Sequence, residues 1–322
     1  MPLLTVSNLQ KRFNLEAGFF ASLGRFVYAV NGVSFSIGKN ETYGLVGESG
    51  CGKTTTARLL VRMYEADEGQ ILFCAPSAES AEIDVLRLKG KALRQYRKKV
   101  KYVFQDPARS LNPRMKVYDI LTSGARWSLD KGERKYLKEE AASILEETGL
   151  QKADLERRPV EFSGGQRQRI SIARGLLMKP DLLICDEVVS ALDVSIQGQI
   201  LNLLQDIRSK REIAFLFIAH DLRVACYFCD RIGVMYRGEL MEEAPAAELY
   251  KTGYHPYTEL LFSSVVGRGA PRPGEEERVN PKSGAGCTFY TRCPYGEKRC
   301  RETHPPLIEA APNHLVRCFR QK

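Results

Sequence analysis

The feature that most constrains this chain is a glycine-rich stretch directly after the apolar run 43–46. It reads Gly47-Glu48-Ser49-Gly50-Cys51-Gly52-Lys53-Thr54-Thr55 and fits the pattern G-x-x-x-x-G-K-[ST]. Glycines let successive backbone N–H groups point inward around phosphate oxygens, and a following helix adds the positive end of its dipole. We therefore expect a strand, a phosphate-binding loop and a helix in that order.

Lys53 and Thr54 suit a nucleoside triphosphate bound to this loop. The lysine would reach the β- and γ-phosphates, and the threonine hydroxyl would ligate Mg²⁺. A tight glycine turn with a solvated lysine is the alternative, but the strand before and the helix after favour phosphate binding. The loop alone leaves many families of nucleotide hydrolases open.

A second candidate half of the site follows the apolar run Leu182-Leu183-Ile184-Cys185. Asp186 and Glu187 come at the end of this expected buried strand. Asp186 would hold Mg²⁺ through water, and Glu187 would polarise the attacking water as general base. An acidic pair at a strand end is usually only solvated, but the phosphate loop earlier in the chain favours catalysis.

Three further elements carry polar groups at the start of a helix or the end of a strand. Ser163-Gly164-Gly165-Gln166 opens an expected helix, whose N-terminus could bind a second anion. His220 follows the apolar run 214–219, from which it could reach a γ-phosphate. Gln105 follows the strand expected over 101–104 and could sense Mg²⁺ and water. A lone histidine or glutamine is usually structural, so the joint order of these residues is what matters.

The pattern along the chain alternates short strands with helices. Strands are expected near 4–6, 33–37, 70–74, 101–104, 182–185 and 214–219, and helices over 55–63, 89–101, 115–162 and 195–209. Strands separated by helices predict an α/β fold with a mostly parallel sheet. Residues 267–286, rich in Gly, Pro and charge, predict a linker.

Composition excludes some classes of protein and leaves others open. No stretch of the 322 residues approaches 18 uncharged apolar positions, and the N-terminus lacks a signal-peptide core, so we expect a cytoplasmic protein without a membrane span. The net charge of +9 is compatible with nucleic acid, an anionic membrane surface or nucleotide. The basic run 89–101 is best interpreted as a solvated helix face, because it has few interleaved aromatic residues.

Taken in order, these motifs resemble those of the ABC-type ATPases over nearly the whole chain. Gly47–Thr54 resembles the Walker A motif, Gln105 the Q-loop, 162–166 the signature, 182–187 Walker B, 190–193 the D-loop and His220 the switch histidine. Two departures are Phe162, where the signature has leucine, and Val188, where proline commonly follows the glutamate. Phe162 keeps an apolar side chain at its position.

The resemblance implies a site shared between two such domains packed head to tail. Each ATP would lie between the Walker A loop of one domain and the signature of the other, so Ser163 to Gln166 would serve the partner's ATP. Mg²⁺ would be held by Thr54, Gln105 and Asp186, and the catalytic residues would be Glu187, His220 and Gln105. Asp193 of the D-loop would also line the nucleotide. Phe13 matches the aromatic that stacks on adenine, with Phe26 or Tyr28 as alternatives and a buried core role also open.

Three longer stretches resemble the ATP-binding subunits of oligopeptide/dipeptide permeases, whose relatives import nickel and other small solutes. They are FQDPARSLNPR at 104–114, SALDVS at 190–195 and HPYTE at 255–259. The resemblance implies a P-loop NTPase (RecA-like) α/β core with an antiparallel β subdomain, a helical subdomain near 89–165 and a Cys-rich C-terminal extension. The ATP-binding domain would span 1–255 and the extension 256–322.

The same resemblance implies an ATPase that powers import through membrane partners. These would be a second ATPase subunit, identical or different, two permease subunits and an extracytoplasmic substrate-binding protein, with this chain peripheral on the cytoplasmic face of the membrane. The alternative is a soluble ABC ATPase that acts on nucleic acid or ribosomes. We expect no nucleic-acid partner, because such relatives tend to carry two cassettes or long coiled coils.

Four of the nine cysteines are crowded into the last 36 residues, namely Cys287, Cys293, Cys300 and Cys318. In a cytosolic chain such a cluster suggests a soft metal before disulfides. No C-x2-C pair occurs among them, which argues against an ordinary zinc ribbon. The resemblance supports a 4Fe–4S cluster with a structural role, and zinc or free thiols are the alternatives. Cys226 and Cys229 do form a C-x2-C pair, which we interpret as helix packing.

Overall fold

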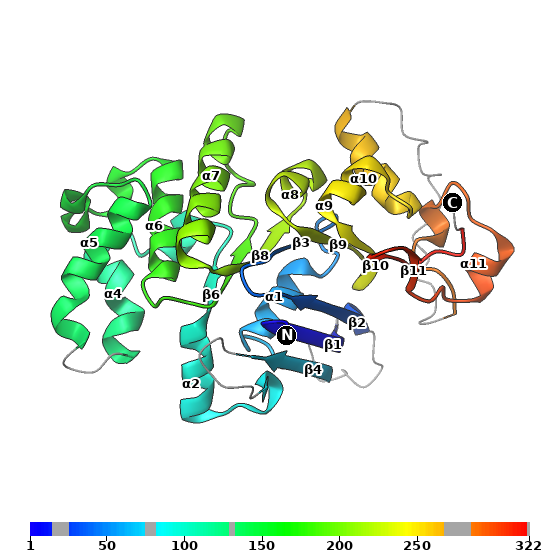
Figure 1. The fold of residues 1–322 in the computed structure, drawn as a ribbon, viewed down its shortest axis with the longest axis horizontal. Helices are drawn as coiled ribbons and strands as arrows, with labels where there is room; N and C mark the ends of the chain where they lie inside the picture. The colour runs from blue at the N-terminus through cyan, green and yellow to red at the C-terminus, as the bar shows by residue number, and fades with distance from the viewer. Residues whose placement is uncertain (15–25, 75–81, 129–132, 267–284, 321–322) are drawn as a thin grey trace. The chain divides into compact units, whose positions relative to one another are not determined.

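The computed structural model describes residues 1–14, 26–74, 82–128, 133–266 and 285–320 (Figure 1). The chain divides into two compact units. Unit 1 comprises Met1–Leu4, Ile37–Glu41 and Leu72–Ile218, and unit 2 comprises Thr5–Ser36, Thr42–Ile71 and Ala219–Lys322. Most of the linker expected over 267–286 lies outside the described residues.

Unit 1 is built on three parallel strands that lie in the order β8 (Ala214–Ala219), β7 (Leu182–Asp186) and β6 (Val100–Val103). Every residue of β7 and β8 is buried. Such uninterrupted apolar runs are typical of parallel strands covered on both faces. The predicted strands at 182–185 and 214–219 are therefore confirmed, and both carry polar residues directly after them.

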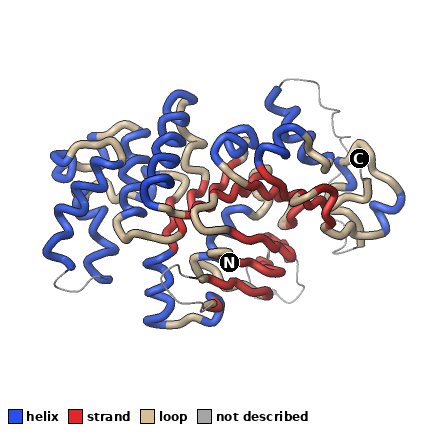
Figure 2. The backbone as a smooth tube through the Cα atoms, in the orientation of Figure 1, coloured by secondary structure: helices blue, strands red, loops and turns tan. Residues whose placement is uncertain are grey.

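Helices make up most of the rest of unit 1 (Figure 2). They are α2 (Gly90–Lys99), α3 (Pro107–Ser110), α4 (Val117–Ser128), α5 (Leu137–Glu147), α6 (Gly164–Leu176) and α7 (Val194–Arg211). Helices α4, α5 and α6 pack on one another, and α6 also packs against α3, α7 and β6. The short strand β5 (Ile83–Asp84) pairs antiparallel with the end of β4 (Glu68–Phe73).

Two helix predictions in this unit are wrong in their bounds. The helix expected over 115–162 contains the separate helices α4 and α5, and α5 ends before Gly149, which has a φ of +78°. The N–H of Gly149 donates to the carbonyl oxygen of Glu146, and the N–H of Leu150 donates to that of Leu145. Short 3-10 turns follow at Lys152–Glu156 and Pro159–Glu161. The helix expected over 89–101 ends at Lys99, because Val100 pairs with Leu182 and begins β6.

Unit 2 contains strands in the order β11 (Ile308–Ala311), β12 (His314–Val316), β10 (Glu239–Pro245), β9 (Arg231–Tyr236) and β3 (Thr42–Val46). Strands β3 and β9 are parallel and the other pairs are antiparallel. The last part of the chain therefore adds two strands to the sheet that precedes the glycine loop.

A second group of strands in this unit has the order β2 (Phe26–Ile37), β1 (Leu4–Asn14) and β4 (Glu68–Phe73). The helices of unit 2 are α1 (Lys53–Leu60), α8 (Leu222–Phe228), α9 (Ala246–Lys251), α10 (Pro256–Val266) and α11 (Lys298–Glu302). Among the described residues, none of the helices combines the length and the apolar character that crossing a bilayer requires.

Candidate ATP-hydrolysis site

The glycine loop lies between β3 and α1, and its backbone conformation requires glycine at two positions. A Cβ atom on Gly52, whose φ is +110°, would lie 2.1 Å from the carbonyl oxygen of Ala29. A Cβ on Gly47 would lie 2.2 Å from the carbonyl oxygen of Met235. Both positions are therefore closed to any side chain, and the loop packs directly on neighbouring backbone.

Lys53 is the first residue of α1 and its side chain is buried within the loop. Its Nζ donates to the carbonyl oxygens of Gly47 at 2.6 Å and Glu48 at 3.0 Å. Carbonyl oxygens satisfy the ammonium's hydrogen bonds without neutralising its charge, so a phosphate would be a stronger partner. Helix α1 also lacks a side-chain cap at its N-terminus, where the positive end of the helix dipole favours an anion. The loop therefore fits the triphosphate predicted for it.

In unit 1, the two acidic residues lie where β7 ends. Asp186 is buried, and its Oδ2 accepts a hydrogen bond from the hydroxyl of Tyr102 on β6. Glu187 follows with a φ of +48°, and its backbone N–H donates to Ile218 of β8 at 3.0 Å. This left-handed backbone conformation is uncommon for a non-glycine residue. The hydrogen bond to Ile218 holds the backbone of Glu187 against the neighbouring parallel strand β8.

Gln105 and Glu187, predicted to act together, are in direct contact. The Nε2 of Gln105 donates to Oε2 of Glu187 at 2.6 Å, although 82 positions separate them in sequence. The contact follows from the parallel pairing of β6 with β7, since the carboxyl ends of parallel strands lie at one edge of a sheet. An amide donor on this carboxylate can orient it toward a water molecule.

Tyr102 is a residue of this site that the sequence analysis missed. It precedes Gln105 by three positions and its hydroxyl orients Asp186. The register of β6 against β7, which pairs Tyr102 with Ile184, places its hydroxyl near the strand end. The alternation of side chains in Val100–Val103 was a weak signal for this, because it does not reveal which strand lies beside it.

The turn after Glu187 leads into the predicted D-loop. Ser190 donates to the carbonyl oxygen of Glu187 twice, from its backbone N–H at 3.1 Å and from Oγ at 2.9 Å. Asp193 then caps α7 from an exposed position and makes no side-chain capping hydrogen bond. Its carboxylate thus stays accessible at the surface of unit 1.

The signature residues form the start of α6. Ser163 Oγ accepts from the N–H of Gln166 at 3.3 Å, and Gln166 Oε1 accepts from the N–H of Ser163 at 2.9 Å. This capping box fixes the first turn of the helix. Both side chains are exposed, so the helix N-terminus is open to a partner, as the trans role predicts. That role itself stays a prediction.

His220 and the candidate adenine platforms belong to unit 2 and are exposed. His220 lies at the bend after β8. Phe13, Phe26 and Tyr28 are 36%, 42% and 40% exposed, which is inconsistent with a core-filling role. Phe13 packs edge-on against Tyr64 with ring centroids 5.5 Å apart. Which of the three stacks on adenine stays a prediction.

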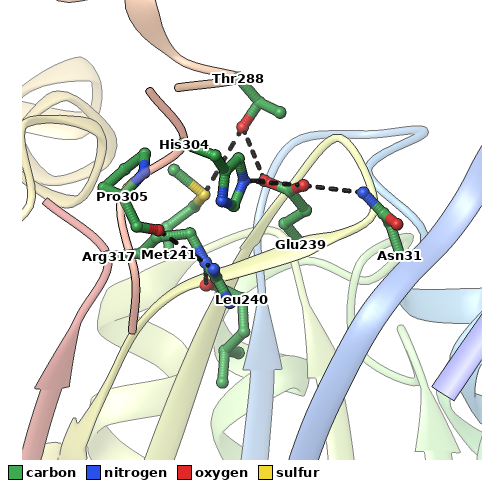
Figure 3. Close-up of polar contacts among 8 residues, drawn as sticks. All are labelled: Asn31, Glu239, Leu240, Met241, Thr288, His304, Pro305 and Arg317. Atoms are coloured by element: carbon green, nitrogen blue, oxygen red, sulfur yellow. Dashed lines mark hydrogen bonds and ion pairs between the residues drawn. The ribbon is translucent and has the colours of Figure 1, made fainter. Parts of the chain in front are cut away.

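The C-terminal extension is joined to the rest of unit 2 through a buried carboxylate on β10, shown in Figure 3. Glu239 accepts hydrogen bonds from Asn31 Nδ2 at 2.8 Å and from Thr288 Oγ1 at 3.1 Å. His304 Nε2 lies 3.1 and 3.0 Å from the two carboxylate oxygens. One side chain thus links β2 and β10 to two points of the extension.

A second buried glutamate on β10 repeats this arrangement. Glu242 accepts from the backbone N–H groups of Tyr254 at 2.8 Å and His255 at 3.0 Å, and His314 Nε2 lies 2.6 Å from its Oε1. Burial lowers the pKa of His255 to about 4, and its Nδ1 accepts from the N–H of Tyr257 at 3.0 Å. His255 is therefore a neutral structural residue at the start of α10.

The four cysteines of the extension line one pocket, together with His255 and Phe289. The N–H of Cys287 donates to the carbonyl oxygen of Cys300 at 2.7 Å, so the two ends of the segment 287–300 are hydrogen-bonded to each other. Burial raises the pKa of Cys287 to about 12 and also raises the pKa of Cys293 and Cys318.

Within the described residues, no group of three or more His, Cys, Asp or Glu side chains is arranged to hold a single metal ion. The cysteines are therefore gathered around a common space without the close spacing of a mononuclear site. Of the remaining cysteines, Cys185 is buried in β7, and Cys226 and Cys229 belong to α8 and its C-terminal cap.

Two family models match the chain. Residues 30–190 match the ABC transporter model, and residues 241–300 match the C-terminal region of oligopeptide/dipeptide transporters. The oligopeptide transport ATP-binding protein AppF of Bacillus subtilis is 42% identical, with 98% of this chain and 96% of that protein covered. The probable peptide ABC transporter ATP-binding protein y4tS of Sinorhizobium fredii is 41% identical, with 98% and 89% covered.

Solved structures agree with the fold. That of cbiO1 from Clostridium perfringens, described as part of the ABC transporter complex cbiONQ, has a TM-score of 0.63 and 25% identity over 78% of this chain and 91% of that one. The ADP conformation of MJ1267, an ATP-binding cassette, has a TM-score of 0.65 and 23% identity over 81% and 98%. They confirm the predicted fold class.

The fold and the motif residues together define an ATP-binding cassette ATPase. The chain belongs to the ABC transporter family and carries the C-terminal region of its oligopeptide/dipeptide branch.

Proposed function

We propose that this chain is the ATP-hydrolysing subunit of an importer for oligopeptides or dipeptides, or for a related small solute such as nickel. The observation that carries the proposal is the match of 241–300 to the oligopeptide/dipeptide C-terminal region in a chain that also has the cassette. Relatives similar along nearly the whole chain are described as oligopeptide or peptide transport ATP-binding proteins. This favours transport over action on nucleic acid or ribosomes.

In this proposal each motif residue has its own role in ATP hydrolysis. Lys53 and the loop N–H groups bind the β- and γ-phosphates, and Thr54, Gln105 and Asp186 would hold Mg²⁺, which would supply positive charge beside the phosphates. Glu187 accepts the proton of the attacking water, and its contact with Gln105 at 2.6 Å supports that role, since it orients the carboxylate. His220 contacts the γ-phosphate. Phe13 stacks on adenine.

The partners follow from the exposed start of α6. Its first turn carries a capping box, and the side chains of Ser163 and Gln166 are exposed, which suits contact with the ATP of a second cassette. We propose that this chain pairs with a second ATPase subunit and docks on two permease subunits at the cytoplasmic face of the membrane. A substrate-binding protein on the other side delivers the solute.

A transport assay tests this function. The chain is co-expressed with candidate permease and ATPase subunits from the same genome, and the complex is reconstituted in vesicles with a candidate substrate-binding protein. We expect ATP-dependent peptide uptake that is lost in Lys53→Ala. ATPase activity stimulated by RNA or DNA, with no co-purifying membrane subunits, would contradict the proposal.

The cysteine pocket has a proposed occupant of its own. We propose that Cys287, Cys293, Cys300 and Cys318 hold a 4Fe–4S cluster that stabilises the extension. Four thiolates are the donor set such clusters use, and all four cysteines line one pocket, which supports the proposal. When bound, the cluster would act as a covalent clip for a segment with little core of its own.

Anaerobic purification from iron-replete cells tests the cluster. We expect a brown protein with about four iron atoms per chain, and a colourless protein from Cys293→Ser. Cys226→Ser, which changes a cysteine of α8 outside the pocket, is the matched control and keeps the colour. A stable wild-type chain with one zinc or no metal would contradict the proposal.

A further inference from the structure

The phosphate loop contains an acidic side chain at a position where a polyanion is to bind. Glu48 follows the first glycine of the loop, and its side chain is 43% exposed. A carboxylate close to a triphosphate repels it, and the repulsion is strong wherever the surrounding protein lowers the effective dielectric constant. The glycine geometry alone does not remove this charge.

An arginine of the C-terminal extension donates two hydrogen bonds to this carboxylate. Arg292 Nη1 donates to Glu48 Oε2 at 2.7 Å, and Nη2 donates to Oε1 at 2.8 Å, across 244 positions of sequence. Such bidentate pairs are among the strongest charge-assisted hydrogen bonds. Arg292 holds the pKa of Glu48 below its usual value, and Glu48 raises the pKa of Arg292. The carboxylate is therefore both ionised and neutralised by its partner.

An aromatic cluster holds the guanidinium of Arg292 beside Glu48. The guanidinium carbon of Arg292 lies 5.6 Å from the ring centroid of Tyr236 and 5.9 Å from that of Phe289, within cation–π range. Phe289 is 1% exposed and meets Tyr236 edge-on at 5.2 Å. Arg292 therefore rests on buried rings of the extension and of β9.

The same cluster also contacts the backbone of Glu48. The N–H of Glu48 donates to the hydroxyl of Tyr257 at 2.9 Å. Tyr257 is fully buried, and its ring lies 4.7 Å from Tyr236 and 5.4 Å from Phe289 between centroids. One residue of the phosphate loop is thus held by its backbone and by its side chain from the C-terminal part of the chain.

We propose that Arg292 is a positioning residue for ATP. Arg292 acts through Glu48, because it neutralises the charge of Glu48 and holds that carboxylate toward the extension. The C-terminal extension is then part of the nucleotide site and completes the electrostatics of the phosphate loop. This inference rests on the proposed binding of ATP to that loop.

The proposal has a specific signature in binding and kinetics. Without Arg292 the unpaired carboxylate opposes the phosphates, so the Kd and KM for ATP rise, by about 5- to 10-fold for a half-exposed charge. The turnover rate at saturating ATP stays within about twofold, because Arg292 contacts none of the groups assigned to hydrolysis. The loss of ATP affinity becomes smaller at high salt, because salt screens the repulsion between the half-exposed carboxylate of Glu48 and the phosphates.

The experiment compares variants of the full-length chain by ATP titration, and by steady-state hydrolysis with its partner ATPase. Arg292→Ala is expected to bind ATP 5- to 10-fold more weakly, Arg292→Lys to lose less, and Glu48→Gln/Arg292→Ala to recover most of the affinity. Arg301→Ala, an exposed arginine on α11, is the matched control and binds ATP as the wild type does. Lys53→Ala tests the underlying site and should lose ATP binding.

Two results would overturn the proposal. One is wild-type ATP affinity in Arg292→Ala, and the other is a double variant that binds as weakly as Arg292→Ala. In the second case Arg292 would act only through the structure of the extension. If Lys53→Ala bound ATP normally, the assignment of the phosphate loop itself would fail, which is a distinguishable outcome. Should Arg292→Ala fail to fold, the comparison of Arg292→Lys with Glu48→Gln/Arg292→Lys decides, and equal affinities there would also overturn the proposal.

Discussion

The phosphate loop and the C-terminal extension both belong to unit 2, yet different interactions hold them in place. The loop is fixed by its own backbone, with Gly52 in the left-handed region and Lys53 bonded to a carbonyl six positions earlier. The extension is fixed by side-chain pairs between residues far apart in sequence, such as Glu239 with His304 and Glu242 with His314.

This difference explains which substitutions destabilise each region. In the loop, substitutions that add atoms destabilise the fold, because the backbone of one segment contacts the backbone of another. In the extension, substitutions that remove one partner of a buried pair destabilise the fold, because the remaining polar group loses a hydrogen bond and cannot replace it with water. The contact between Glu48 and Arg292 is where the two regions meet.

Gly52→Ala is expected to have the largest effect on stability. Its Cβ would overlap the carbonyl oxygen of Ala29 at 2.1 Å, and its φ of +110° is unfavourable for alanine. We expect the free energy of unfolding to fall by about 3 kcal/mol or more, measured by urea denaturation. Gly50→Ala is the matched control, since Gly50 also has a positive φ of +79° but has no atom within 4 Å of its Cβ position. It should cost about 1 kcal/mol, and equal losses would show that close packing does not fix the loop.

His314→Ala comes next and probes the extension. It removes the contact of His314 with the buried Oε1 of Glu242 at 2.6 Å and leaves that oxygen only the N–H of Tyr254, so it should lower the free energy of unfolding by about 2 to 3 kcal/mol. The control is Glu302→Ala, which removes an exposed pair with Lys298 on α11 and should change stability by a few tenths of a kcal/mol. A loss from His314→Ala no greater than from Glu302→Ala would mean that buried pairs do not anchor the extension.

Tyr257→Phe is expected to have the smallest of these effects. It removes only the hydroxyl that accepts from the N–H of Glu48, so stability should fall by about 1 kcal/mol in the same denaturation assay. Tyr250→Phe, which changes a tyrosine that is 62% exposed, provides the control and should be neutral. An unchanged free energy of unfolding in Tyr257→Phe would show that the hydrogen bond between Glu48 and Tyr257 does not stabilise the contact between the two regions.

The sequence allowed the loop to be predicted almost completely, because nine consecutive residues carry its structure. It also assigned Gln105 and Glu187 to one ATP site, and the structure shows their side chains in contact at the ends of two paired parallel strands. Bounds of helices failed where one residue decided them, as at Gly149. Tyr102 and Arg292 were missed for another reason. Their roles depend on which distant strand or loop lies beside them, and a single sequence holds no local signal for that.

Hydrolysis by Glu187→Gln tests the central claim most directly, that one chain supplies Glu187 to the ATP held by its own phosphate loop and its signature to the ATP of a partner. The chain is mixed with its partner ATPase, Mg²⁺ and ATP, and turnover and assembly are measured together. We predict that turnover falls by about 10²- to 10³-fold while the ATP-bound pair becomes more stable, and that Glu146→Gln, an exposed glutamate of α5, changes neither. Unchanged turnover in Glu187→Gln, or no pairing with ATP in any variant, would contradict the account.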